Sequence, residues 1–396
     1  MTQMTRRALL GSSLAAGTTL ALPTVVSPLT AHAGAPAILK PLPPEWFTDF
    51  GSNAEMRWDS VDPSARLTPQ QRLFVRNHTV TPQLTRESYA LEVYGDGLAS
   101  PRGVTEPIRL TFAELRAMPV TRLESTHECT GNGRSFFTRQ QGQQVSGTGW
   151  SLGAVGTVRW EGVRLADVLR RVGVSPEAVS VQATGLDPSY VTGGTDFGRV
   201  RRPFPIDKAL DDALLAWGMN GEDLLPDHGF PLRLVLPGWV GIASIKWLGS
   251  LEVARRQLTS PWNTTWYTMT GGDYPPGSPP LSVNPVRSAW ELPWGAELRA
   301  GRPVRLTGRS WSGAGAVRRV EVSVDGGRRW RPAVLDRHKR GLGWRQWSVT
   351  TVLPRGAHTL QARATDIHRR TQPLETPYNS NGYFFDAVVR HPVVVR

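Results

Sequence analysis

The stretch from Thr126 to Phe137 reads THECTGNGRSFF and contains Cys129, the only cysteine among 396 residues. Gly131 and Gly133 follow the thiol, and Arg134 stands five positions after it. Glycine lets the backbone form tight turns whose N–H groups face an anion, and a nearby arginine favours a thiolate or binds a small oxyanion through two parallel hydrogen bonds. The stretch therefore predicts that Cys129 lies at the centre of a site.

The residues alone leave three interpretations of this thiol. It could be a small buried hydrophobe, which composition by itself favours, a thiol that pairs between chains, or a ligand. His127 could act as a base for a thiol nucleophile, but its spacing of two positions is more typical of a structural residue. A zinc site would need three or four ligands, and neither a second cysteine nor a histidine pair at ligand spacing is present.

The first 33 residues have the pattern of an export signal. Arg6 and Arg7 precede an uncharged apolar run, and Ala31-His32-Ala33 is an A-x-A cleavage site. The arginine pair favours the twin-arginine type, which exports folded proteins, over a plain secretory signal. We expect a soluble mature chain that begins near Gly34 in the periplasm or outside the cell, with no membrane span.

The rest of the chain is long enough for two domains. The first, 34–272, should begin with an extended arm, 34–70, and alternate short strands with short helices, which predicts an α+β fold. Its clearest elements are a strand and turn at 89–97, helices at 111–118 and 163–173, and a buried strand at 231–238. A linker rich in Gly and Pro, 273–284, separates it from a second domain, 285–396.

The second domain has a different pattern. Short alternating strands are predicted at 302–311, 317–330, 345–353, 358–366 and 388–395. Turns such as Asp325-Gly326-Gly327 separate them, which indicates an antiparallel β-sandwich of the immunoglobulin-like type. Residues 299–396 hold 19 Lys and Arg against 6 Asp and Glu, so this part carries the surplus behind the net charge of +13. Because these arginines are spread over strands and turns, nucleic-acid binding is not favoured.

Several motifs, taken in order, resemble the sulfite oxidase family of molybdenum enzymes. They are FVRNHTVTP, ECTGNGRSFF, GTGW, AVGTVRWEGVRLADVL, TGLDP, LLAWGMNGEDLLPDHGFPLRLVLPGWVGIASIKWLGSLEV, SPWNTTWYT and SVDGGRRW. The resemblance covers nearly the whole chain after the signal. It implies a molybdopterin-binding domain of the sulfite oxidase type, followed by an immunoglobulin-like dimerisation domain, and hence a homodimer.

The resemblance also implies a molybdenum–molybdopterin cofactor with Cys129 as the protein ligand of the metal, and a soft thiolate suits such a centre. Asp187 would bind the pterin N–H groups, and cationic and backbone donors would hold its polar oxygens and phosphate. The implied cofactor-binding residues are Arg76, Asn77, His78, Cys129, Asp187, His228, Arg233, Ser244, Ile245 and Lys246.

For the substrate, the resemblance implies a sulfite pocket. Arg76 and Arg134 match the arginines that bind the anion, and Trp150 matches a tryptophan that lines the pocket. Tyr267 matches a tyrosine beside the metal, and Arg340 matches an arginine that reaches the site from the second domain.

The implied reaction is oxidation of sulfite to sulfate by oxygen-atom transfer. With a single cysteine the chain has no C-x-x-C-H motif for haem, so we expect an external electron acceptor such as a c-type cytochrome.

Gly133 replaces the first of two arginines that are usual in sulfite oxidases. With Gly133, the cysteine loop resembles that of the molybdenum subunit of sulfane dehydrogenase. A wider, less cationic rim of the substrate pocket would suit a bulkier, protein-bound sulfane sulfur. Sulfite remains the first hypothesis. Two further hypotheses stay open, namely a different oxidoreductase of this fold, such as a nitrate reductase, and a non-catalytic exported binding protein.

Overall fold

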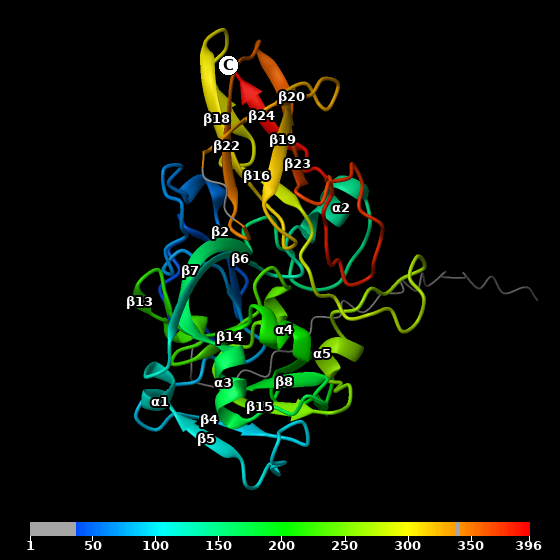
Figure 1. Cartoon of the computed structure of the whole chain (residues 1–396). Coiled ribbons are helices and arrows are strands. Elements are labelled where there is room, and N and C mark those ends of the chain that lie inside the picture. The colour runs from blue at the N-terminus through cyan, green and yellow to red at the C-terminus, as the bar shows by residue number, and fades with distance from the viewer. Residues whose placement is uncertain (1–36, 338–340) are drawn as a thin grey trace, which may run out of the picture.

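The computed structural model describes residues 37–337 and 341–396, which form two domains stacked along one long axis (Figure 1). The first domain is α+β and the second is a β-sandwich, as the sequence predicts. The predicted export signal, 1–33, and Arg340 lie outside the described residues.

Five strands of the first domain form a mixed sheet in the order β11-β8-β15-β4-β5. All neighbours are antiparallel except β15 and β4. Along β4 half-buried and buried residues alternate, with Leu91 and Val93 fully buried, so one face packs on the core. This confirms the strand predicted at 89–97. The strands span β4 (Ala90–Tyr94), β5 (Ile108–Thr111), β8 (Ser180–Gly185), β11 (Arg201–Pro205) and β15 (Leu248–Ala254).

A second sheet, in the order β13-β12-β7-β6 with β14 paired to β12, leads to the cysteine. Strands β6 and β7 pair without interruption from Val120↔Val163 to Glu128↔Val155, and Cys129 is the next residue. The thiol therefore sits where a long strand ends. The strands are β6 (Val120–Glu128), β7 (Val155–Arg164), β12 (Leu214–Met219), β13 (Glu222–Asp223) and β14 (Arg233–Val235), and a separate hairpin joins β9 (Val191–Thr192) to β10 (Thr195–Asp196).

The helices are short, and the two predicted ones are present. At α1 the Thr111 side chain accepts from the Glu114 N–H, and the Glu114 side chain accepts from the Thr111 N–H. Helix α3 ends at Gly173, whose φ of 80° stops the helix. The helices span α1 (Phe112–Arg116), α2 (Ser135–Gln141), α3 (Leu165–Val172), α4 (Ile206–Asp211), α5 (Pro261–Thr264), η1 (Trp58–Ser60), η2 (Pro226–His228) and η3 (Gly241–Ala243).

The N-terminal segment differs from the extended arm that we expected. Strands β1 (Phe47–Asp49) and β2 (Asn53–Met56) form a hairpin, and β2 also pairs with β3 (Val75–Arg76). Gly51 has a φ of +82°, which a turn of this kind requires. All four residues of β2 are buried, so the backbone hydrogen bonds must be made within the protein, and a sheet provides them.

The second domain is built from two sheets, in the orders β16-β18-β22-β21 and β17-β24-β23-β19-β20. Leu306, Val320, Trp347 and Leu360 lie in the core between them. Each of the five predicted strand regions contains a strand. The strands are β16 (Arg287–Trp290), β17 (Ala296–Leu298), β18 (Pro303–Trp311), β19 (Val317–Ser323), β20 (Arg331–Pro332), β21 (Val334–Leu335), β22 (Arg345–Val352), β23 (Gly356–Asp366) and β24 (His391–Val395).

Two segments of the second domain reach down to the cysteine end of β6 (Figure 1). The Leu342 carbonyl accepts from the Thr126 N–H at 2.8 Å. On the other side, the Phe384 N–H donates to the Thr130 carbonyl at 3.1 Å. The second domain therefore contacts the residues on both sides of Cys129.

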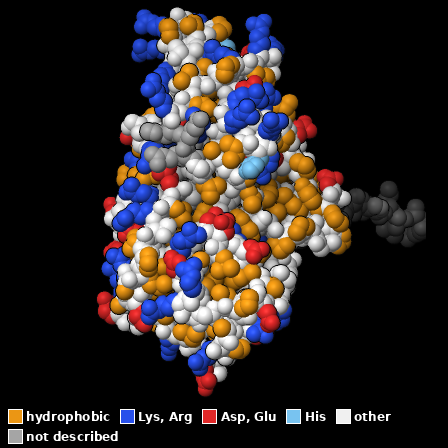
Figure 2. Space-filling model, viewed as in Figure 1, with side chains coloured by type: hydrophobic (Ala, Val, Ile, Leu, Met, Phe, Trp, Pro, Cys, Tyr) orange, Lys and Arg blue, Asp and Glu red, His pale blue; other side chains and the backbone are white. Residues whose placement is uncertain are grey.

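The face shown in Figure 2 carries many of its Lys and Arg side chains on the second domain, in keeping with the surplus of basic residues there. Within residues 37–337 and 341–396, helices with the length and apolar character needed to cross a membrane are absent.

Candidate active site

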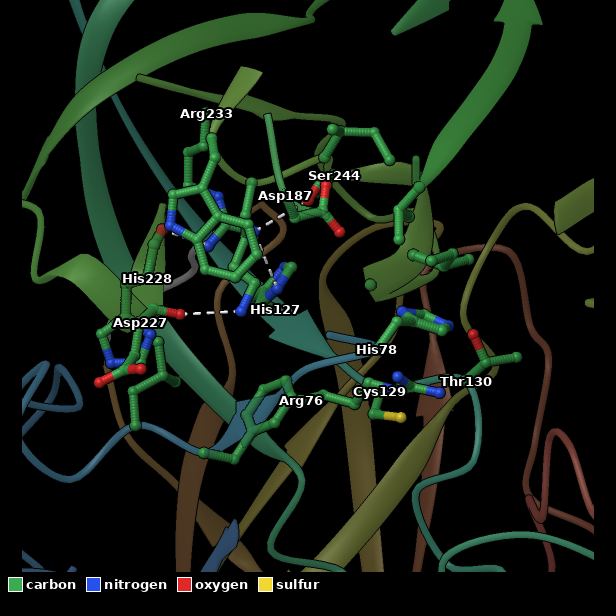
Figure 3. A pocket seen from close by; sticks show the side chains of 18 of the residues that line it. Arg76, His78, His127, Cys129, Thr130, Asp187, Asp227, His228, Arg233 and Ser244 are labelled. Carbon is green, nitrogen blue, oxygen red and sulfur yellow. Dashed lines mark hydrogen bonds between the residues drawn. The ribbon is translucent and has the colours of Figure 1, made fainter. Parts of the chain in front are cut away.

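One pocket collects most of the residues that the sequence singled out. It lies between the end of β6, β14 and the loop that precedes β15 (Figure 3). The implied site residues that line it are Arg76, His78, Cys129, Asp187, His228, Arg233, Ser244, Ile245, Lys246 and Tyr267. They come from segments far apart in the chain, so the fold brings them together.

The Cys129 loop is held by hydrogen bonds of Asn132. Its side-chain N–H donates to Glu128 Oε1 at 2.8 Å, its carbonyl oxygen Oδ1 accepts from the Ala154 N–H at 3.0 Å, and its backbone N–H donates to the Cys129 carbonyl at 3.0 Å. Gly133 has a φ of +86°, a conformation that favours glycine. These contacts fix the direction of the thiol.

The thiol is buried enough that desolvation raises its pKa, while the positive charges of Arg76 and Arg134 and the Gly131 N–H act in the opposite direction. The protein alone therefore keeps the thiol protonated, and a soft metal ion that binds the thiolate would displace the proton. This environment suits a thiol that stays protonated until it binds a metal ion.

Tyr267 and His78 form the wall beside the thiol. The Tyr267 hydroxyl lies 3.2 Å from His78 Nε2, and burial raises the pKa of Tyr267 and lowers that of His78 well below its ordinary value. Tyr267 has a φ of 59°, uncommon for a residue with a side chain, so its placement is maintained against a backbone preference.

The opposite part of the pocket is lined by two basic side chains, the buried Arg233 and the half-buried Lys246. Arg233 donates from Nη1 to the His228 carbonyl at 2.9 Å and from Nη2 to the Ser244 carbonyl at 3.1 Å. Lys246 donates from Nζ to the Asn77 side chain and to the Asp227 carbonyl, the latter at 2.9 Å. Burial lowers the pKa of Arg233 to about 9, and burial together with the charge of Arg233 lowers the pKa of Lys246 well below its ordinary value.

These residues fit a cofactor that carries both a metal and a phosphate. The positive charges of Arg233 and Lys246 repel each other, and an anion between them would relieve that repulsion. The Nε of Arg233 and Oδ1 of Asp187 are buried and have no hydrogen-bond partner among the described residues. Burial also raises the pKa of Asp187 to about 6. A pterin N–H would satisfy the unpaired oxygen, and a phosphate would satisfy the donors.

The structure qualifies one expectation, about Arg134, and corrects another, about Gly133. Arg134 donates from Nε and Nη1 to the carbonyls of Asn381 and Thr148, each at 2.9 Å, so Nη2 and the second N–H of Nη1 remain for an oxyanion. The space beside Gly133 is not a widened rim. A Cβ at that position would lie 3.1 Å from Phe385 Cβ, so the C-terminal segment fills the space.

Arg134 and two further implied residues, Trp150 and Asn77, are not among the described residues that line the pocket. Trp150, only 1% exposed, packs edge-on against Phe50 and Phe74 behind the thiol. Asn77 accepts from Lys246 and so positions the lysine. Arg340 belongs to the residues that the structure does not describe.

Some lining residues were not identified from the sequence. His127, interpreted as structural, lines the pocket, and its Nε2 lies 3.3 Å from Arg233 Nη2. Asp227 accepts from the backbone N–H groups of Leu39 and Lys40 and from Thr81, so it ties the N-terminal segment to the pocket. Its place directly before His228 was a signal that could have been used.

Comparison with known proteins agrees with this geometry. Residues 78–262 match the family model described as oxidoreductase molybdopterin binding domain, and residues 285–395 match the Mo-co oxidoreductase dimerisation domain. The chain is 35% identical over 333 residues to sulfite oxidase of Gallus gallus, covering 78% of this chain and 68% of that protein.

Two further relatives extend the comparison. Mitochondrial sulfite oxidase of Homo sapiens is 35% identical over 329 residues, covering 78% of this chain, which spans 57% of the human protein's length. The crystal structure of the sulfane dehydrogenase SoxCD from Paracoccus pantotrophus aligns with a TM-score of 0.74 and 27% identity, over 91% of each chain. From its two matched domains and these relatives, the chain belongs to the sulfite oxidase family of molybdopterin oxidoreductases.

Proposed function

We propose that the protein oxidises sulfite to sulfate at a molybdenum–molybdopterin centre and passes the electrons to an external acceptor such as a c-type cytochrome. The observation that carries the proposal is the position of Cys129. Its thiol shares one pocket with Arg76, His78 and Tyr267 on one side and the basic side chains of Arg233 and Lys246 on the other. A thiolate ligand, an anion-binding wall and a phosphate-binding wall are the parts that such an enzyme needs.

The cofactor would supply the oxygen-atom transfer and accept two electrons. Around it, Arg76 attracts the anion, and the low pKa of His78 keeps this neighbour of the Tyr267 hydroxyl neutral, so it can share a hydrogen bond with that hydroxyl without adding a charge. Arg233 and Lys246 would hold the phosphate, and Asp187 would accept from the pterin ring. The Cys129 loop, held by Asn132, would keep the thiolate in place.

Protein-bound sulfane sulfur is the alternative substrate. It is supported by the fold similarity to SoxCD and by Gly133. Because Phe385 fills the space beside Gly133, however, that glycine does not enlarge the entrance. Sulfite, the smaller substrate, therefore remains our proposal.

The test is elemental analysis of the purified protein, followed by reduction of cytochrome c with sulfite. Stoichiometric molybdenum with sulfite-dependent reduction, both lost in Cys129→Ser, would support the proposal. Molybdenum without sulfite turnover would overturn it in favour of sulfane sulfur or of another substrate such as nitrate. A melting curve of the variant separates loss of the ligand from loss of the fold.

Export and assembly belong to the same proposal. We infer that the Arg6-Arg7 signal directs the protein to the periplasm or beyond, and that the second domain forms a homodimer. Replacing both arginines by lysine should retain the precursor in the cytoplasm if the signal is of the twin-arginine type. Light scattering that reports a monomer at micromolar concentration would contradict the dimer.

A further inference from the structure

A loop of the second domain, residues 379–385, packs directly on the Cys129 loop. Besides the bond from Phe384 to Thr130, the Asn381 carbonyl accepts from Arg134 Nε at 2.9 Å. The loop is internally braced, because the Asn379 side chain donates to the Tyr383 carbonyl and accepts from the Tyr383 N–H, both at 2.8 Å. The side chain of Tyr383 is therefore held in a defined place beside the active site.

The ring of Tyr383 extends the wall made by Tyr267. The two rings are stacked with centroids 5.3 Å apart and an angle of 14° between their planes, and the Arg134 guanidinium lies 5.4 Å from the centroid of Tyr383. Only 7% of Tyr383 is exposed. Burial raises its pKa, and the charges of Arg134 and Arg76 act against that rise, which agrees with a hydroxyl close to both arginines. Tyr383 thus lies directly beside Tyr267, which lines the pocket of the thiol, and beside Arg134.

The hydroxyls of Tyr267 and Tyr383 differ in the hydrogen-bond acceptors available to them. That of Tyr267 is engaged with His78. The Tyr383 hydroxyl lies near the Tyr267 backbone N–H, which acts against the rise in its pKa, and its own proton has no acceptor among the described residues. A buried phenol whose proton is free, beside two arginines, is arranged to donate to an oxygen of an anion.

We propose that Tyr383 is a substrate-binding residue contributed by the second domain, whose hydroxyl donates a hydrogen bond to an oxygen of the anionic substrate beside Cys129. The inference rests on the proposed function for the identity of the substrate, but it requires only that an oxyanion bind at this place. It makes the catalytic pocket incomplete without the second domain. It also gives a role to a residue that lies outside the motifs of the sequence analysis.

The experiment compares Tyr383→Phe with Tyr378→Phe in the molybdenum-loaded protein. Tyr378 lies just outside the same loop, but its hydroxyl donates to the Gln144 carbonyl at 3.0 Å, so its loss removes the same atom without touching the site. Sodium sulfate is the probe, and its dissociation constant is measured by calorimetry. Tyr383→Phe should weaken sulfate binding by about 10-fold or more, while Tyr378→Phe should bind like the wild type.

Steady-state kinetics add a second readout. In Tyr383→Phe the KM for sulfite should rise more than kcat falls, with molybdenum content unchanged. Sulfate affinity and KM within about twofold of wild type would overturn the assignment, as would a wild-type protein that does not bind sulfate. If the wild type binds sulfate through Tyr383 but does not oxidise sulfite, only the proposed function fails.

Discussion

Arg287 and Glu128 form a buried ion pair between the two domains, with side chains 1% and 0% exposed. Arg287 is the first residue of β16, and Glu128 is the last residue of β6, directly before Cys129. The same Glu128 oxygen also accepts from Asn132, which braces the cysteine loop. An arginine of the second domain is thus linked through two side chains to the loop that carries the thiol.

We therefore expect Arg287→Met to affect both stability and the metal centre. Leaving a buried carboxylate unpaired should cost about 3 to 5 kcal/mol of the free energy of unfolding. Because Glu128 then keeps only Asn132 as a partner, the loop should shift and change the EPR spectrum of the molybdenum-loaded protein in its one-electron-reduced, Mo(V) state.

Arg309→Met is the matched control. Arg309 and Glu291 form another buried pair, 0% and 2% exposed, with no contact to the cysteine loop among the described residues. It should destabilise the protein by a similar amount but leave the spectrum unchanged. Equal spectral changes in both variants would show that the Arg287 effect is only a general loss of stability.

Gly133→Ala tests whether the C-terminal segment closes the space beside the cysteine loop. Gly133 has a φ of +86° and a Cβ there would meet Phe385, whereas Gly142 has a φ of +70° and nothing within 4 Å of its Cβ position. Both Gly133→Ala and Gly142→Ala carry a backbone cost of about 1 kcal/mol. Urea unfolding should show a larger loss for Gly133→Ala. Equal losses of stability would mean that Phe385 moves away at little cost and that the space beside residue 133 can open.

Glu55 should give the protein a pH-dependent stability. It is buried, accepts from the Ser151 N–H and hydroxyl and from the Gly153 N–H, and burial raises its pKa to about 7 from 4.5. A raised carboxyl pKa means that the folded protein holds the proton where the unfolded chain has lost it. The free energy of unfolding should therefore fall as pH rises from about 4.5 to 7, by up to about 3 kcal/mol.

In Glu55→Gln this part of the pH dependence should vanish. Chemical denaturation of both proteins across that pH range measures the difference in their free energies of unfolding. As pH rises, the variant should become more stable relative to the wild type. A constant difference would show that Glu55 ionises normally.

Lys246 should be responsible for much of the anion affinity of the cofactor pocket. Protein made in a host without the cofactor should gain stability on addition of inorganic phosphate beyond the gain from chloride at equal ionic strength, because phosphate relieves the repulsion between Lys246 and Arg233. In Lys246→Gln the shift in melting temperature should be smaller. The same shift in both proteins would mean that phosphate binds elsewhere.

Much of the site could be predicted from the chain because its motifs are local. Cys129 follows a strand and precedes a glycine-rich turn, and His228 and Arg233 lie on one short turn and the start of β14. In such short segments the residue types favour the same local backbone conformation in different proteins. The strands of the second domain were predictable for a similar reason, since apolar residues recur along them with a period of two.

Other features depend on residues that are distant in sequence. His127 was predicted to be structural, and β14 places Arg233 beside it. Arg134 was predicted to bind an anion, and the carbonyls of Thr148 and Asn381 engage two of its nitrogens, which leaves Nη2 for an anion. A hydrogen-bond partner 247 residues away, as Asn381 is, cannot be inferred from spacing.

By itself the sequence determined the two domain types and the family and singled out Cys129 as the centre of a site, because residue identity and local order specify turns and strand periodicity. Only the tertiary structure decided which donors remain available in the pocket and that Tyr383 of the second domain stacks on Tyr267. The physical reason is that a buried polar group needs hydrogen-bond partners, and these partners decide whether the group is free to bind a ligand. The partners come from segments that are distant in sequence and meet only in the folded chain.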